Sequence, residues 1–310
     1  GATYLRHMTP AYRNALLLLH LTVFLWGWTG IFGKLISQNA AQLVFTRTFI
    51  ALAGLALFAL FTRRSLDPRT PDIGNYFFMG VLIMLHWLTF YGSIKVSTAS
   101  IGAACMSTST MFTALMEPFW FKRRIRSYEV VLGVVVIAAL LLMFGLETQY
   151  RLGIALGVFS ALLSAWFNIV NGVLVKRGDP VRIGFYELFF VMLCAVVWVT
   201  VNGEVPQLPW TLERSDLLYQ LLLGLLCTTF AFVTGIAVMK ELSPFTVVLA
   251  VNLEPVYTIL IALFIWGAGE RMHNGSYLGI ALILACLFAN GWFQARERRR
   301  QEATTIAPLP

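Results

Sequence analysis

The sequence predicts an all-α polytopic membrane protein, in which ten transmembrane helices form two inverted five-helix repeats around a central cavity. Three observations support this prediction. Hydrophobic residues make up 58% of the 310 residues and charged residues only 12%, with a mean hydropathy of +0.76; soluble proteins carry about twice that charged fraction. The apolar residues fall into ten long stretches, and the second half of the chain repeats features of the first.

Each apolar stretch is long enough to cross a bilayer, which takes about 20 helical residues at a rise of about 1.5 Å per residue. The connections between the stretches are short, and only 202–216, with its prolines and acids, forms a longer loop. No room is left for a soluble domain. In order, the predicted spans are 14–33, 42–61, 74–94, 99–121, 128–146, 152–172, 183–201, 217–239, 243–266 and 275–293.

Basic residues bound these spans and set their orientation, because cytoplasmic loops collect Lys and Arg. The N-terminus, the loops after spans two, four, six and eight, and the C-terminus hold most of the 23 cations: Arg6, Arg13, Arg63, Arg64, Arg69, Lys122, Arg123, Arg124, Arg126, Lys176, Arg177, Arg182, Lys240, Arg296, Arg298, Arg299 and Arg300. The opposite ends hold Lys34, Lys95, Arg151, Arg214 and Arg271. We therefore expect a multi-pass protein of the cell inner membrane with both termini in the cytoplasm.

The repeat divides the chain. Trp26 matches Trp166, and the pattern Phe-Thr-Arg-Thr-Phe at 45–49 matches Phe-Tyr-Glu-Leu-Phe at 185–189. Five spans per repeat is an odd number, so the second repeat lies inverted in the membrane, a plan that recurs in secondary transporters. The expected domains are a tag remnant at 1–7, repeats at 8–147 and 148–295, and a basic cytoplasmic tail at 296–310.

Glu254 lies near mid-depth of the ninth predicted span and is followed by Pro255, which cannot donate a backbone hydrogen bond and so loosens the helix there. A carboxylate at this depth costs a few kcal/mol or more and normally faces protein or water. Two interpretations are open. Glu254 is either a protonated acid that links helices or the site of a substrate or a proton.

The chain resembles the ten-span EamA-domain branch of the drug/metabolite transporter superfamily from about residue 16 to 293. The resemblance rests on Phe-Leu-Trp-Gly at 24–27, Phe-Thr-Arg at 45–47, Leu-Glu-Pro-Val at 253–256 and Gly-Glu-Arg at 269–271. It implies a basket-shaped bundle with a central cavity and alternating access. Members mostly export amino acids, amines and other small metabolites, and some take up quaternary amines. The first half departs from this pattern, with Ser109-Thr110 where the second has Glu254-Pro255, so only one acid is central.

Several polar and aromatic residues are candidates for substrate binding or coupling beside Glu254. Helical spacing places Tyr257 and Thr258 on its face, and the mirror span four supplies Ser109, Phe112 and Thr113. His86 and Tyr91 lie at comparable depth, and Asn168 follows in span six. A lone histidine in an apolar helix, such as His86, is more often a core residue with its hydrogen bonds satisfied than a proton carrier. The proton-carrier interpretation stays open because an imidazole titrates near neutral pH.

Trp26 and Trp166 lie away from the predicted membrane interfaces, so an interfacial role fits them poorly. They either pack in the core or present faces to a cationic amine through cation–π attraction. Arg47 and Glu187 occupy matching positions in spans two and seven with opposite charges. With Pro255 they are candidates for gating or anchoring, and we expect Arg47 and Glu187 not to pair but to snorkel, each toward its own interface.

These features predict a secondary active transporter, not an enzyme, that exports small metabolites, namely amino acids (aromatic ones included) or related amines, with H⁺ as a possible coupling ion on Glu254. The alternative is uptake or exchange of a quaternary amine in an aromatic cage with Glu254. A lipid-conjugate flippase or membrane accessory protein is the alternative of another class. The sequence has no P-loop, dinucleotide or metal motif, so we expect no cofactor and no nucleic acid, and a chain with both repeats suggests a monomer.

Overall fold

The computed structural model describes residues 10–67, 73–120, 122, 127–174, 178–238, 241–242, 250–251 and 253–306. Its long helices, in chain order, are α2 (Pro10–Leu35), α3 (Ala40–Phe61), α4 (Ile73–Val96), α5 (Ala99–Met106), α6 (Ser109–Trp120), α7 (Ser127–Leu146), α8 (Arg151–Leu174), α9 (Pro180–Val201), α10 (Arg214–Leu221), the π-helix η3 (Leu222–Phe230), α11 (Ala231–Val238), α13 (Glu254–Trp266) and α14 (Asn274–Ile306). Short 3₁₀ turns are η1 (Thr148–Tyr150), η2 (Pro209–Thr211) and η4 (Gly267–Glu270).

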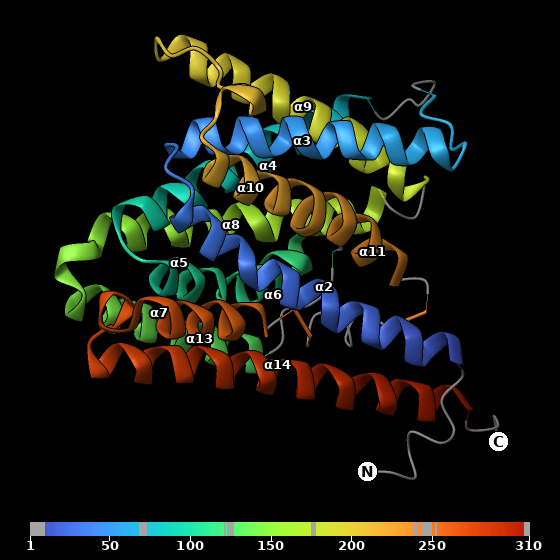
Figure 1. The fold of residues 1–310 in the computed structure, drawn as a ribbon. Coiled ribbons are helices and arrows are strands. Elements are labelled where there is room, and N and C mark those ends of the chain that lie inside the picture. Colours follow the sequence, from blue (N-terminus) through green and yellow to red (C-terminus); the bar gives the residue numbers. More distant parts are fainter. Residues whose placement is uncertain are drawn as a thin grey trace.

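Within these ranges, nine helices are long and apolar enough to cross a membrane. They coincide with nine of the predicted spans, which confirms the fold class. The ninth span in chain order is described only in part, since 243–249 and 252 lie outside the described residues, and its second half is α13. The start of α2 and the end of α14 lie at the same end of the bundle, at the lower right of Figure 1.

The helix packing shows the internal repeat in three dimensions. The first helix of each repeat packs against the third and fourth spans of the other: α2 against α11 and α13, and α8 against α4, α5 and α6. The second helices each pack against the third span of the other repeat, α3 against η3 and α9 against α4. The pairs α5 with α13 and α7 with α14 join equivalent spans directly. This reciprocity is what two repeats related by a pseudo-two-fold axis require.

Two spans break at equivalent places near the middle of the bundle. Span four divides into α5 and α6 at Ser107-Thr108, whose hydroxyls donate to the carbonyls of Ala104 at 2.6 Å and Cys105 at 2.7 Å. In the second repeat a turn at Leu253 precedes α13. The first residues after the breaks are Ser109 and Glu254, the pair that the sequence repeat aligns.

Span eight contains a different irregularity, the π-helix η3. In its wider turns, backbone carbonyls can accept hydrogen bonds from side chains. Thr228 Oγ1 donates to the carbonyl of Leu223 at 2.8 Å in this way. Such segments are rare and occur mainly at functional sites. Gly224 brings η3 close to α3, because a Cβ there would lie 2.7 Å from Ile50 and 3.1 Å from the Arg47 carbonyl.

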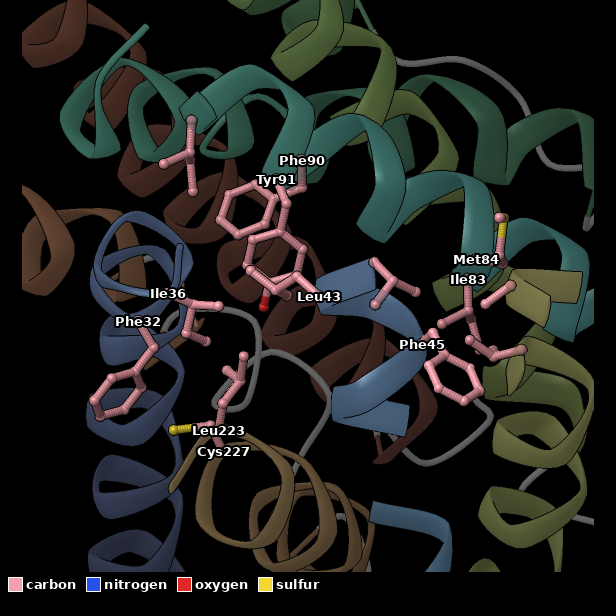
Figure 2. Packing of buried hydrophobic residues seen from close by; sticks show 14 of the residues in the cluster. Phe32, Ile36, Leu43, Phe45, Ile83, Met84, Phe90, Tyr91, Leu223 and Cys227 are labelled. Carbon is pink, nitrogen blue, oxygen red and sulfur yellow. The ribbon is translucent and has the colours of Figure 1, made fainter. Parts of the chain in front are cut away.

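The main apolar core lies between α2, α3, α4, α8, α9 and η3. Figure 2 shows residues from several of these helices meeting, with Tyr91 of α4 directed toward the space between α2 and α3, and Leu223 and Cys227 reaching in from η3. Tyr91 lies close against α2 because Gly33 has no side chain: a Cβ on Gly33 would be 2.6 Å from the Tyr91 ring.

Close backbone packing between α4 and α9 predicts a strong effect of one added methyl group. A Cβ on Gly80 would lie 2.4 Å from Phe190 Cβ and 3.0 Å from backbone atoms of 190 and 191, so the helices themselves must separate. We expect Gly80→Ala to lower the free energy of unfolding by about 1–3 kcal/mol. Thermal unfolding in detergent checks this.

The matched control is Gly145→Ala, on an exposed face of α7 with no atom within 4 Å of the new Cβ. Because alanine favours a helix over glycine, this variant should be neutral or slightly stabilised. Equal unfolding temperatures for the two variants would contradict the packing of α4 on α9.

Candidate functional site

The centre of the candidate site is Arg47, which lies two turns into α3 and is 4% exposed. Its Nε–H donates to Thr228 Oγ1 of η3 at 2.8 Å, and its Nη1 donates to the hydroxyl of Tyr91. The guanidinium stacks on the Trp87 ring, with Cζ 3.9 Å from the ring centroid. Two neighbouring spans, α4 and the one that contains η3, therefore fix the position and plane of this cation.

The neighbours of Arg47 are neutral. Among the described residues it forms no ion pair, and no described residue accepts a hydrogen bond from its Nη2. The expectation that Arg47 snorkels to an interface is therefore wrong. The hydroxyls of Tyr91 and Thr228 and the face of Trp87 give the guanidinium a polar, aromatic shell inside the bundle.

Glu254 supplies the opposite charge. It is half-buried at the first residue of α13, followed by the buried Pro255 in the first turn, where a proline's missing N–H costs nothing. Its carboxylate attracts the Arg47 guanidinium and lies in electrostatic range of Tyr91 and Cys227. The two charged groups do not touch, since no nitrogen–oxygen pair between them is within 4.0 Å. A carboxyl group and a guanidinium thus lie within electrostatic range of each other without forming an ion pair.

Tyr257 and Thr258, expected beside Glu254, hold α13 against α2. The Thr258 hydroxyl donates to the Gly27 carbonyl at 2.8 Å and to the Glu254 carbonyl at 3.2 Å. Tyr257 packs over Gly27 and meets the Phe24 ring edge-on, with centroids 5.6 Å apart. Both side chains are engaged in this helix contact.

His86 is buried between α4 and α8 in a reciprocal pair with Ser160. The Ser160 hydroxyl donates to the His86 carbonyl at 2.8 Å, so the His86 Nδ1 must be the donor to Ser160, whose carbonyl is 3.0 Å away. The arrangement selects the Nδ1–H tautomer when the ring is neutral. Of the two interpretations from the sequence, this geometry favours the satisfied core residue.

Trp26 and Trp166 lie in equivalent places but do not converge. Trp26 packs toward α11, where a Cβ on Gly235 would be 3.1 Å from its ring. Trp166 packs toward α4 and meets Phe78 edge-on at 5.7 Å, with its Nε1 buried and without a partner in the described chain. Trp26 and Tyr257 border one apolar cluster and Trp166 another, so the three rings form no common cage.

The other predicted residues lie along α6, α8 and α9. Thr113 Oγ1 donates to the Ser109 carbonyl at 2.9 Å, and Phe112 is half-buried on the same helix. Asn168 is exposed and its amide is 3.4 Å from Ser164 Oγ in its own helix. The structure brings none of these four into contact with Arg47.

Glu187 also departs from expectation, because it is fully buried rather than extended to an interface. Its Oε2 accepts from Asn171 Nδ2 at 3.3 Å, while Oε1 and Asn171 Oδ1 have no partner among the described residues. As expected, it forms no ion pair with Arg47. The snorkelling expectation for Glu187 is wrong for the same reason as for Arg47: each side chain is buried in the bundle.

The sequence reasoning missed Trp87, Cys227 and Thr228 as site residues. In the sequence Trp87 is one aromatic residue among several near His86. The triplet Cys-Thr-Thr at 227–229 was a usable signal, because polar residues inside an apolar span usually bond to something in the bundle. The π-helical backbone of this segment could not be predicted from any pattern in the sequence.

A second polar cluster ties together the end of the bundle where α2 passes into α3, here called the α2–α3 end. Glu270 is fully buried and accepts from Lys34 Nζ at 2.5 Å and from the backbone N–H groups of Ala99 at 3.2 Å and Ser100 at 2.8 Å. Lys34 also lies over the Trp266 ring at 4.4 Å. Glu270 thus joins α2 to the start of α5.

Three further contacts hold the same end, two of them to the second repeat and one, from Lys95, within the first. Asp216 of α10 accepts from the backbone and the hydroxyl of Ser37. Lys95 donates to the Ile36 carbonyl. Gln220 Nε2 donates to Gln38 Oε1 at 2.6 Å.

The loop before α10 adds an exposed clamp at the α2–α3 end. Glu204 accepts from Asn39 at 3.0 Å and from Gln42 at 2.8 Å, and these hydrogen bonds lower the pKa of the Glu204 carboxyl. With the bonds of Glu270, Asp216 and Gln220, this clamp closes the α2–α3 end.

The fold and this interior site define a class: a multi-pass membrane transporter of two repeats with charged groups at its centre. The profile of the EamA-like transporter family matches residues 13–145 and 151–291, one match per repeat. The chain belongs to the EamA-like transporter family, within the drug/metabolite transporter type.

A comparison with solved structures adds the fold alone. A solved structure described as "Crystal structure of protein" aligns over 94% of this chain and 99% of its own, with a TM-score of 0.63 and 16% sequence identity. At that identity the likeness concerns architecture only. No curated protein matches the chain.

The hydrogen bond from Arg47 to Tyr91 predicts a measurable stability effect. Removing the hydroxyl in Tyr91→Phe leaves an N–H of a buried cation without its acceptor, which typically costs about 1–3 kcal/mol. Denaturant unfolding in mixed micelles measures the loss. Tyr186→Phe is the control, because that hydroxyl bonds only to a neutral carbonyl, Leu66, in the α3–α4 loop at 2.8 Å. An equal loss of unfolding free energy in the two variants would contradict the role of the Tyr91 hydroxyl as an acceptor for a buried cation.

Proposed function

We propose that this protein is a secondary active transporter of the inner membrane that exports small metabolites, namely amino acids or related amines, by alternating access with Glu254 at the central site. One observation carries the proposal. Glu254 begins a half-helix at a break shared by both repeats, facing the interior in electrostatic range of Arg47. Broken helices at a repeat interface are where secondary transporters bind substrates and ions.

In this mechanism an amine-bearing substrate replaces a proton on Glu254. A carboxylate inside the bundle needs a positive partner, and either a proton or a substrate ammonium satisfies that need. Competition between them couples outward substrate movement to inward proton movement. Exchange of one neutral amino acid for one proton moves net charge and so produces a current.

The distribution of cations supports an orientation with the α2–α3 end toward the periplasm. The bonded network there represents a closed outer side, so opening to the periplasm requires the Lys34–Glu270 pair and its neighbours to separate. Alternating access therefore predicts that the strength of this network sets the balance between the two states.

The quaternary-amine alternative has weaker support. It needs aromatic faces that converge around Glu254, whereas Trp26 and Trp166 pack in different helix contacts. No observation on the described helices favours a flippase or an accessory role.

Solid-supported-membrane currents on reconstituted protein test the proposal. Pulses of neutral, aromatic and cationic amino acids and choline should evoke a current in the unsubstituted protein that falls to background in Glu254→Gln. Glu213→Gln is the control, because this carboxylate is exposed at the start of α10 and caps no backbone group. Full currents in Glu254→Gln would remove Glu254 from coupling and binding.

The closed network gives a separate prediction. Glu270→Gln weakens three hydrogen bonds to one buried carboxylate. Breaking a buried ion pair costs several kcal/mol, so this change should shift the balance from the closed toward the open state of the α2–α3 end. A cysteine introduced at the buried Thr46 should then react with a membrane-impermeant maleimide about tenfold faster or more. Glu213→Gln at the same end is again the control. Unchanged labelling would show that Glu270 does not hold this end closed.

A further inference from the structure

Arg47 has more hydrogen-bonding capacity than the described chain uses. A guanidinium carries five N–H donors, and those of Arg47 make two hydrogen bonds to the described residues, both to neutral hydroxyls. Its Nη2 group has no acceptor among the described residues, although the side chain is only 4% exposed. Charged side chains are rare at such positions, and where they occur they mark substrate or ion pathways.

The shell around Arg47 orients the guanidinium for a planar anion. Trp87 stacks against one face of the group, and Thr228 and Tyr91 fix Nε and Nη1. The remaining Nη2 donors therefore point along a defined direction. A guanidinium held in this way matches a carboxylate, which accepts in the same plane through two oxygens.

Glu254 supplies the complementary half. It attracts Arg47 without touching it, and its carboxylate makes no hydrogen bond to the described chain. A simple cation would satisfy Glu254 alone and leave Arg47 unpaired, while a simple anion would do the reverse. A small molecule with adjacent positive and negative groups satisfies both.

We propose that Arg47 binds the α-carboxylate of the substrate while Glu254 takes its α-ammonium, so that the site selects zwitterionic amino acids over amines that lack a carboxylate. This inference rests on the proposed function and assigns Arg47 a binding role. The faces of Trp87 and Tyr91 beside the guanidinium supply an apolar wall for the substrate.

Ligand pairs that differ only in the carboxylate test this assignment. L-phenylalanine is compared with phenylethylamine, and L-leucine with isopentylamine, by isothermal titration calorimetry on the full chain in detergent, with choline as a further amine. The unsubstituted protein should bind the amino acid of each pair about 10- to 100-fold more tightly, the range expected for a charge-assisted hydrogen bond. This comparison needs no variant.

The protein-side test uses Arg47→Gln and Arg47→Lys, each checked for folding by thermal unfolding. Arg47→Gln should abolish the preference for the amino acid, and Arg47→Lys should restore part of it, because a lysine keeps the charge but not the planar fork. Arg64→Gln is the control, since Arg64 pairs with Asp179 at 2.7 Å in exposed loops. It should keep the full preference.

Each outcome decides the matter. Loss of the preference in Arg47→Gln alone supports the assignment. Equal binding of amino acid and amine to the unsubstituted protein, or an unchanged preference in Arg47→Gln, overturns it while leaving an amine transporter in place. Binding of none of the five compounds, together with no evoked current, removes both the proposed function and the role of Arg47.

Discussion

The burial of one guanidinium inside a membrane bundle is the constraint on which the centre of this structure depends. A charge at such a depth costs free energy unless the protein supplies polar partners. Three local features supply them here. Gly33 lets the Tyr91 ring lie against α2, η3 brings Thr228 to Nε, and Trp87 provides a flat face. The irregular backbone of η3 is accounted for in the same terms, because it lies where Arg47 needs an acceptor.

The two repeats share a backbone plan but not a charge distribution. Ser109 and Glu254 both begin a helix after a break, yet only the second repeat carries an acid there. Arg47 and Glu187 occupy equivalent positions with opposite charges, and the buried Glu187 has an amide, Asn171, as its described partner. The charged centre therefore combines a cation from the first repeat with an acid from the second. In the proposed mechanism the symmetry of the scaffold provides two states of access, and the difference in charge between the repeats provides one polar site.

The sequence predicted the architecture well because bilayer-spanning helices have a simple requirement: enough apolar residues in a row. Nine of the ten spans appear in the described residues as helices long and apolar enough to cross a membrane, and helices that align in the repeat make equivalent contacts. Depth and helical face were harder to predict. Arg47 was expected to snorkel because long side chains commonly do, and only the packing of α3 against η3 and α4 shows it turned inward. Thr258 shares a face with Glu254, but its hydroxyl is used by Gly27 across the contact with α2. Such partners come from helices far apart in the sequence, so spacing along one helix cannot reveal them.

An experimental structure with a bound heavy-atom amino acid tests the central claim most directly. In a crystal grown with p-iodo-L-phenylalanine, anomalous scattering locates the iodine and so fixes the orientation of the ligand. The ligand carboxylate is expected at about 2.7–2.9 Å from the Arg47 guanidinium, and the ligand ammonium should face Glu254. Arg47 and Glu254 should form no direct ion pair with each other. A ligand held elsewhere, with Arg47 and Glu254 in a direct ion pair, would contradict this claim.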